Sequence, residues 1–252
     1  MRYHSLDVRV GPPSESVRIS SREMAAESEI DAVAGIVSIW MSEEAVARFV
    51  RAEATLLILT IVFLLRRIAW YHVHGACLID PRGRGWLFVG NAKGGKSTTT
   101  ALLVRRGWTL VTDDVGFLDV QSGQATLIGP RQPIELRDGG RELLGLGVGF
   151  DVGRGDATGF WPEEFGGSWT DRIKPEIIAF PRLGEHTTIS PSTPRQALSA
   201  IVKASSLVLL EPAFAQPHLD ALGMLARQSR CFDLTIGPDL LVTPQILESL
   251  VE

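Results

Sequence analysis

Cysteine is scarce in this chain: Cys77 and Cys231 are the only two among its 252 residues, and they lie far apart in the sequence. Two isolated thiols fit a reducing compartment better than a disulfide framework, which needs several paired cysteines in a short chain. We therefore expect a cytoplasmic protein.

Long hydrophobic runs are missing as well. The one segment that suggests a membrane is 54–65, which has charged residues on both sides. A helix needs roughly 20 apolar residues to cross a bilayer, and this run is clearly shorter. Residues 1–20 carry scattered charges and no apolar centre, so they are not a secretory signal. We predict no membrane span and a buried core helix at 54–65, with a peripheral or oligomer-forming helix as the alternative, which leaves a homo-oligomer open.

An excess of basic charge is also absent. The chain has 25 Lys and Arg against 29 Asp and Glu, for a formal net charge of -4. This balance argues against nucleic-acid binding through a broad basic surface. With 45% hydrophobic and 21% charged residues, the chain can bury a sizeable core in one large or two small domains.

Acidic residues are missing from one particular stretch, 81–112, in which basic residues gather. These are Arg82, Arg84, Lys93, Lys96, Arg105 and Arg106. The same stretch contains residues 90–97, Gly-Asn-Ala-Lys-Gly-Gly-Lys-Ser, between the apolar run 86–89 and a helix-like segment 98–106. This is a complete G-x-x-x-x-G-K-[S/T] phosphate-binding loop in strand–loop–helix order, and the positive field suits an anionic ligand.

The residue types in this loop follow from its chemistry. Glycines let backbone N–H groups face a phosphate, and the N-terminus of the next helix adds partial positive charge. We expect Lys96 to reach the β- and γ-phosphates of ATP and the Ser97 hydroxyl to ligate Mg²⁺. The predicted nucleotide-binding residues are Gly90, Asn91, Ala92, Lys93, Gly94, Gly95, Lys96, Ser97 and Thr98.

The rest of the pattern predicts an α/β fold: a nucleotide-binding core at 42–252 behind a small β-rich part at 1–41. The expected strands are 6–10, 17–20, 33–41, 74–79, 86–89, 109–111 and 176–180, with further apolar segments at 232–236 and 240–242. The expected helices are one from Ser42, as N-cap, to about Trp70, and others at 98–106, 194–206 and 217–229. The glycine-rich stretch 139–167 is interpreted as a mobile segment, either a lid or an ordinary solvated insertion.

Two adjacent carboxylates, Asp113 and Asp114, follow the apolar strand 109–111 and are expected beside the phosphate loop. Such a pair can divide its work, with one acid organising Mg²⁺ and the other accepting a proton from a hydroxyl. A surface turn is the alternative. His74 precedes the strand pair that leads into the loop, and alternation predicts that His72 and His74 face the same side. Either histidine is a candidate for catalysis or for a structural role.

Together these residues resemble the HPr kinase/phosphorylase family. The resemblance rests on His74-Gly75, the phosphate loop at 90–97, and the run 106–114, Arg-Gly-Trp-Thr-Leu-Val-Thr-Asp-Asp, and it covers about residues 70–140. It implies a phosphate-loop kinase fold of the HPr kinase/PEP carboxykinase type. Segment 179–182 and the region 219–232 look like the shorter members associated with tailoring of ribosomally made peptides such as lasso peptides.

The resemblance also implies roles for individual residues. Asp114 would be the general base, Lys96 would stabilise the transferred phosphoryl group, and Ser97 and Asp113 would hold Mg²⁺, with His74 in the active site. Glu135 is the nearest candidate for the family's downstream metal glutamate, although its local spacing differs. Arg172, Lys174 and Arg182 are candidates for a phosphate clamp or for plain surface charge. Segment 180–186 does not reproduce the family's phosphorolysis signature, so the reverse reaction is not expected.

The leading hypothesis is therefore an ATP- and Mg²⁺-dependent kinase that phosphorylates a serine of a peptide or small protein, including a lasso-type precursor. A kinase of a small hydroxylated metabolite is the alternative within the enzyme class. A nucleotide-binding regulatory module with slow hydrolysis is the alternative outside it. In such a module Glu211, at the end of the apolar run 207–210, could imitate the acid of an ordinary NTPase, but we interpret this run as core.

Overall fold

The chain is described here from a computed structural model, which covers residues 2–3, 6–10, 16–21, 26–31, 33–43, 51–90, 94–152, 156–205, 207–208, 211–243 and 245–250. Three of the predicted phosphate-loop residues, Asn91, Ala92 and Lys93, lie outside these ranges.

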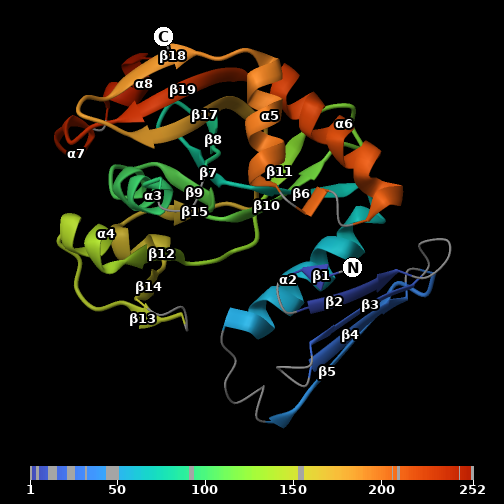
Figure 1. Ribbon diagram of the computed structural model, residues 1–252. Helices are drawn as coiled ribbons and strands as arrows, with labels where there is room; N and C mark the ends of the chain where they lie inside the picture. Colours follow the sequence, from blue (N-terminus) through green and yellow to red (C-terminus); the bar gives the residue numbers. More distant parts are fainter. Residues whose placement is uncertain are drawn as a thin grey trace.

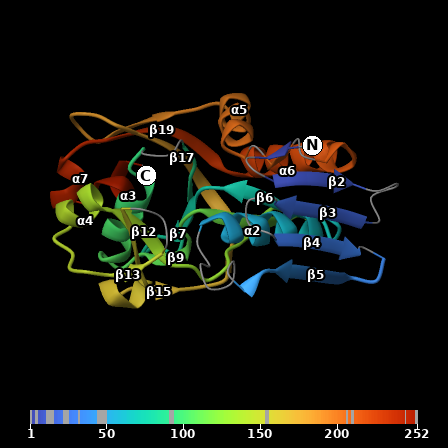
Figure 2. The same ribbon diagram turned by 60° about the horizontal axis from the view of Figure 1, so that its bottom comes forward.

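The N-terminal part is one antiparallel sheet with strand order β1-β2-β3-β4-β5, at one end of the molecule (Figures 1 and 2). Its strands are β1 (Arg2–Tyr3), β2 (Leu6–Val10), β3 (Ser16–Ser21), β4 (Ala26–Asp31) and β5 (Ile36–Met41). The strand expected at 33–41 begins only at Ile36, because residues 33–35 form a turn that Asp31 caps and in which Gly35 has a φ of 67°. Strand β4 was not predicted, although its buried Ala26, Ser28 and Ile30 alternate with acidic residues.

Helix α2 (Arg51–Arg66) covers one face of this sheet and joins it to the larger part of the molecule (Figure 1). Its buried Leu56, Leu59 and Phe63 belong to the same hydrophobic cluster as Val17 and Ile19 of β3. The prediction that this helix reaches Trp70 is wrong. The helix ends at Arg66, and a turn follows in which Ala69 has a φ of 59°. The residues that would join Ser42 to this helix lie outside the described ranges. Among the described residues, no helix is both long and apolar enough to cross a membrane.

The larger part is built on a seven-stranded sheet of order β15-β9-β7-β8-β17-β19-β18, in which β8, β17 and β19 run parallel. Its strands are β7 (Ala76–Ile79), β8 (Gly85–Phe88), β9 (Thr109–Thr112), β15 (Ser168–Trp169), β17 (Pro175–Leu183), β18 (Thr188–Pro191) and β19 (Arg230–Ile236). Because β8, β17 and β19 run parallel, their carboxyl ends meet at one edge, where ligands bind in such sheets.

A second sheet, of order β16-β11-β10-β6, meets the first at Gly75. It contains β6 (Trp70–His74), β10 (Val115–Asp119), β11 (Thr126–Ile128) and β16 (Arg172–Ile173). The single strand predicted at 74–79 is therefore wrong: His74 ends β6, and β7 begins at Ala76 in the other sheet. A Cβ at Gly75 would lie 2.7 Å from the backbone oxygen of Phe88, so the corner requires glycine.

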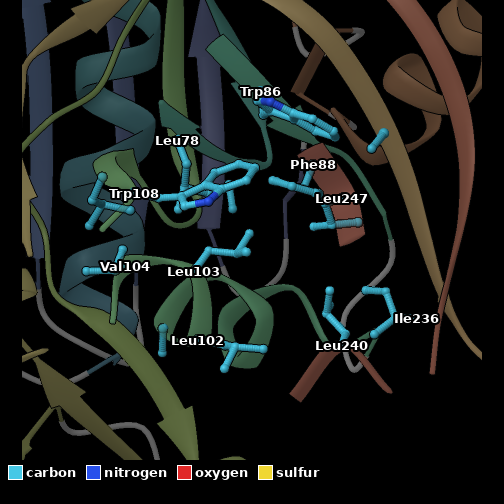
Figure 3. Packing of buried hydrophobic residues seen from close by; sticks show 14 of the residues in the cluster. Leu78, Trp86, Phe88, Leu102, Leu103, Val104, Trp108, Ile236, Leu240 and Leu247 are labelled. Carbon is cyan, nitrogen blue, oxygen red and sulfur yellow. The ribbon is translucent and has the colours of Figure 1, made fainter. Parts of the chain in front are cut away.

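Helices cover both faces of the seven-stranded sheet. They are α3 (Lys96–Val104), α5 (Pro194–Ala204), α6 (Pro212–Gln228), α7 (Asp239–Val242) and α8 (Ile246–Leu250). On the α3 side the core is aromatic, and Trp86, Phe88 and Trp108 pack with ring centroids 5.4 to 6.5 Å apart (Figure 3). On the other side, α5 and α6 bury aliphatic side chains against the sheet. The mixed α/β fold with a phosphate loop after β8 agrees with the prediction.

The glycine-rich stretch 139–167 contains more regular structure than its composition indicates. It holds most of α4 (Asp138–Leu143), then β13 (Phe150–Asp151), β14 (Ala157–Phe160) and the 3₁₀ helix η1 (Pro162–Phe165). With β12 (Ile134–Arg137), strands β13 and β14 form a third sheet. Phe160 is buried in the main core, so part of the stretch is packed, and its role as a lid stays a prediction.

Candidate active site

The phosphate loop leads from β8 into α3. Gly95 precedes the helix with a φ of 82°, a conformation that favours glycine. Lys96 opens the helix, and its Nζ donates a hydrogen bond to the backbone oxygen of Gly90 at 2.7 Å. Burial lowers the pKa of Lys96, while Asp114 and Asp113 act in the opposite direction. The lysine thus lies at a helix N-terminus, where partial positive charge favours an anion.

A cavity of about 880 Å³ opens over the start of α3. Its volume is in the range of small-molecule sites, roughly 300–1,000 Å³. The polar side chains of its wall come from β6, α3, the β9–β10 corner and the β12–α4 and β14 regions: His74, Lys96, Ser97, Thr98, Thr99, Asp113, Asp114, Gln132, Glu135, Arg137 and Asp156. The structure therefore brings the predicted loop lysine, both acids and His74 to one cavity.

Asp113 lies on the buried side of this cavity and is 4% exposed. Burial raises its pKa to about 7, although hydrogen bonds from the Ser97 side chain and the Glu135 backbone oppose this shift. Its Oδ1 is buried and has no hydrogen-bond partner among the described residues. A buried carboxylate oxygen without a partner is costly unless a cation or a proton compensates it.

These features fit a magnesium ion. Mg²⁺ is commonly held by one or two carboxylates together with phosphate oxygens and water, so it needs no dense cluster of protein ligands. Among the described residues no group of three or more His, Cys, Asp or Glu side chains could hold a metal by itself. The unpartnered Oδ1 of Asp113 and the adjacent Ser97 hydroxyl supply the oxygen ligands that such an ion prefers.

Asp114 has a different environment from its neighbour in the chain. Its side chain is 45% exposed, and its Oδ1 lies 3.1 Å from Nδ1 of His74. Burial lowers the pKa of His74, Asp114 raises it and Lys96 lowers it further. The backbone N–H of Gly75 donates to the backbone oxygen of Asp114 at 2.9 Å, which fixes the two corners of the chain to each other.

His72 does not line the cavity, although it lies in β6 two residues before His74 and so on the same face of the strand. It is 5% exposed, and its ring lies edge-on to Phe117 at 6.3 Å. Burial lowers its pKa to about 3, so it is neutral. His72 is therefore a core residue, and His74 is the histidine of the cavity.

Gln132 is a residue of the site that sequence reasoning missed. With its amide oxygen turned toward the β9–β10 corner, it accepts hydrogen bonds from the backbone N–H of Asp114 at 3.0 Å and of Val115 at 3.3 Å. The hydroxyl of Thr112 and the oxygen of Val115, 2.7 Å apart, close the same corner. No local motif marks a lone glutamine, so only the fold shows that it supports the acid pair.

Strand β12 adds two charged residues to the wall. Glu135, the nearest sequence candidate for a downstream metal glutamate, lines the cavity beside Asp113. Arg137 also lines it, and its Nη1 lies 3.9 Å from Oδ1 of Asp156 in an exposed pair. Arg137 was not singled out from the sequence, because its partner Asp156 becomes a neighbour only through the pairing of β12 with β14.

Other candidates lie elsewhere. Arg172 pairs with Asp171, and the Nε of Arg182 donates to Thr235 at 3.1 Å; neither these arginines nor Lys174 line the cavity. Glu211 is 1% exposed and is paired with two arginines at the start of α6, away from the cavity wall. Leu207 and Val208 are buried, which agrees with the interpretation of this run as core, while residues 209–210 lie outside the described ranges.

Comparison with known proteins finds local similarity to one group. Over 76 residues, 30% of this chain, the sequence is 38% identical to HPr kinase/phosphorylase of Clostridium botulinum (strain Eklund 17B / Type B) and 41% identical to that of Clostridium perfringens (strain SM101 / Type A). The match spans 23% of the length of each relative. No protein-family model matches the chain.

Among solved structures, the Hpr(Ser) kinase/phosphatase of Coxiella burnetii aligns with 71% of this chain and 93% of its own, at 16% sequence identity and a TM-score of 0.36. The sequence resemblance to these HPr kinase/phosphorylase relatives is thus confined to 76 residues of the chain. The association with lasso peptides finds no counterpart in these matches.

Proposed function

We propose that the protein is an ATP- and Mg²⁺-dependent kinase that transfers the γ-phosphoryl group to a serine hydroxyl of a peptide or small protein. The observation that carries the proposal is the His74–Asp114 pair, which faces the same cavity as Lys96 and the buried Asp113. A base, a phosphate-binding lysine and a metal-type carboxylate in one cavity are the parts that phosphoryl transfer to a hydroxyl requires.

The two acids have environments that suit different tasks. Asp114 is half-exposed, so a hydroxyl can approach it, and its contact with His74 orients the carboxylate. It is proposed to accept the hydroxyl proton. Asp113 is buried against Ser97, and these two residues would hold the magnesium ion, which when bound neutralises charge on the phosphate oxygens. Glu135 lines the same cavity and is proposed to assist them.

Lys96 supplies the remaining charge. In the structure its Nζ bonds to the Gly90 oxygen, and it is proposed to turn to the β- and γ-phosphates when a nucleotide binds. The N-terminus of α3 points at the same place, so binding and charge stabilisation share one set of groups.

A peptide acceptor is favoured over a small polar metabolite by the rim of the cavity. Leu143 of α4 lines it and is 58% exposed. An exposed leucine offers an apolar contact to a side chain beside the acceptor serine, and a small polar metabolite has little use for it. A serine in a lasso-type precursor peptide is one acceptor of this kind.

The test is mass spectrometry of serine peptides incubated with the protein, ATP and Mg²⁺, with Asp114→Asn in parallel. Loss of a general base is expected to slow transfer by about 10²- to 10⁴-fold, while the affinity for ATP measured by calorimetry stays the same. The matched control is Asp171→Asn, an exposed acid outside the cavity, which should transfer at the wild-type rate.

The outcomes separate the alternatives. Phosphate transfer to the peptide by the wild-type protein but not by the Asp114→Asn variant supports the proposal. Acceptor-independent ATP hydrolysis that survives Asp114→Asn would instead indicate a regulatory nucleotide-binding module. Clear ATP binding with transfer only to small hydroxylated compounds would indicate a metabolite kinase.

A further inference from the structure

The cavity continues past the phosphate loop to the carboxyl ends of β17 and β19, where its wall becomes apolar. The wall in this part consists of Leu183, Gly184, Ile236, Gly237, Pro238, Leu240 and Leu241. None of these residues has a polar side chain. Leu183 lies directly over the phosphate loop, since a Cβ at Gly95 would be 3.1 Å from its Cδ2. Figure 3 shows Ile236 and Leu240 next to each other on the same side of the core.

The two walls of this apolar part are tied together by one polar network. The carboxylate of Asp239 accepts hydrogen bonds from the backbone N–H of Thr187 at 2.9 and 3.0 Å and from its hydroxyl at 2.7 Å. The backbone N–H of Gly237 bonds to the same hydroxyl at 3.1 Å. A Cβ at Gly237 would lie 2.6 Å from Cα of His186, so the walls also approach closely. Because Leu183 of β17 pairs with Ile236 of β19, segments 183–184 and 236–241 lie side by side and together form one apolar side of the cavity, which we call the slot.

Backbone donors of the slot are already used. The N–H of Gly184 bonds to the oxygen of Ile236, that of Leu240 to Gly237, and that of Leu241 to Pro238. Gly237 donates to Thr187, and proline has no N–H. A ligand in the slot therefore contacts apolar surface, and none of these N–H groups is free to donate a hydrogen bond to the edge of a base.

The order of the strands indicates which part of a bound nucleotide would lie in the slot. Strand β8, which leads to the phosphate loop, lies between β7 and β17. The acids and His74 are on the β7–β9 side, and the apolar slot is on the β17–β19 side. The hydroxyl to be phosphorylated must lie beside Asp114, so the other end of the nucleotide extends the opposite way.

From this placement, and on the basis of the kinase function proposed above, we propose that the slot formed by 183–184 and 236–241 binds the base of the nucleotide through one of its flat faces. Apolar walls hold a purine by dispersion and by removal of surface from water, without selecting its edge. Adenine and guanine differ only at their edges in hydrogen-bonding groups. The protein is therefore expected to accept ATP and GTP alike.

The test compares three ligands in the presence of Mg²⁺ by calorimetry: ATP, GTP and inorganic tripolyphosphate. Wild-type protein should bind ATP and GTP within about threefold of each other and tripolyphosphate about tenfold more weakly, because it lacks the base. The variant Leu183→Ala, at a side chain that is 66% exposed, and the double variant with Leu241→Ala should weaken both nucleotides. For the double variant we expect an affinity for ATP and GTP about tenfold lower than that of the wild type, with the affinity for tripolyphosphate unchanged.

Val242→Ala is the matched control, since Val242 is an apolar residue of α7 that is 80% exposed and does not line the cavity. It should leave all three affinities unchanged. A preference for ATP over GTP of more than about thirtyfold would overturn the proposal, because it requires edge recognition. Tripolyphosphate that binds as tightly as ATP would also overturn the proposed base site, but it would leave the phosphate-binding role of the loop unchanged. Failure of all three ligands to bind would overturn the slot and the kinase proposal together.

Discussion

Glu211 is the residue whose replacement separates the two interpretations of the apolar run 207–210 most clearly. Its Oε1 lies 2.7 Å from Nη2 of Arg67, and its Oε2 lies 3.8 Å from Nη1 of Arg66. The three side chains are 1%, 9% and 0% exposed. Glu211→Gln keeps the volume and removes the charge, so two buried guanidinium groups lose their nearby carboxylate.

The cost follows from burial. Breaking a buried ion pair by removing one partner destabilises a protein by about 3–5 kcal/mol, since the remaining charge stays buried. In a chain of this size each kcal/mol lowers Tm by about 2–4 °C, so the expected fall is about 6–20 °C. Arg131 and Glu163 supply the control: their atoms are 2.8 Å apart, but the side chains are 53% and 51% exposed. Glu163→Gln should cost less than about 1 kcal/mol.

The assay is thermal and urea unfolding of the two variants beside wild type, with ATP hydrolysis measured below the transition. A large loss of stability in Glu211→Gln with intact nucleotide binding in the folded fraction agrees with a structural acid. A Glu211→Gln protein as stable as the wild type that has lost hydrolysis would refute this reasoning, and it would make Glu211 the acid of an ordinary NTPase.

Two further predictions concern titration and the metal. Burial lowers the pKa of His218 to about 4, below the value of about 6.5 that it regains on unfolding. The unfolded chain therefore binds more protons below pH 6.5, and stability should fall as the pH drops from 6.5 toward 4. His218→Gln should reduce this slope by up to about 1.4 kcal/mol per pH unit, measured by urea unfolding between pH 4.5 and 7. Asp113→Asn should remove the dependence of ATP affinity on Mg²⁺ while Asp114→Asn keeps it; equal Mg²⁺ dependence in both would assign the metal to another residue.

The parts of the site that were predictable from the sequence are those in which chemistry is encoded by local spacing. The phosphate loop in its strand–loop–helix setting required only residues 86–106. Asp113 and Asp114 were expected beside it because they follow the next strand along the chain, although β7 lies between that strand and β8 in the sheet. The other residues of the site depend on contacts between segments that lie far apart in the chain. Gln132 reaches the acid corner across the fold, and Arg137 meets Asp156 only because β12 and β14 pair.

Local signals also misled where two sheets meet. Residues 74–79 have the composition of a single strand, yet the chain leaves one sheet at His74 and enters the other at Ala76. The reason is the close approach of Gly75 to the Phe88 backbone, which no pattern of hydrophobicity reveals. The apolar segment 240–242 forms part of α7 and not a strand, because Gly237 and Pro238 turn the chain and the oxygen of Gly237 accepts from Leu240.

The corner at Gly75 also explains how two adjacent acids come to differ. Successive side chains at a strand end point to opposite sides, so Asp113 turns into the core beside Ser97 and Asp114 turns toward the cavity mouth. The bond from Gly75 N–H to the Asp114 oxygen holds the two corners together, and His74, one residue earlier, is thereby brought to the Asp114 carboxylate. Asp113 and Asp114 therefore differ in burial, and the backbone contact between Gly75 and Asp114 places His74 beside the Asp114 carboxylate. A change at Gly75 should therefore disturb the acid pair and the histidine at once, although Gly75 itself carries no chemistry.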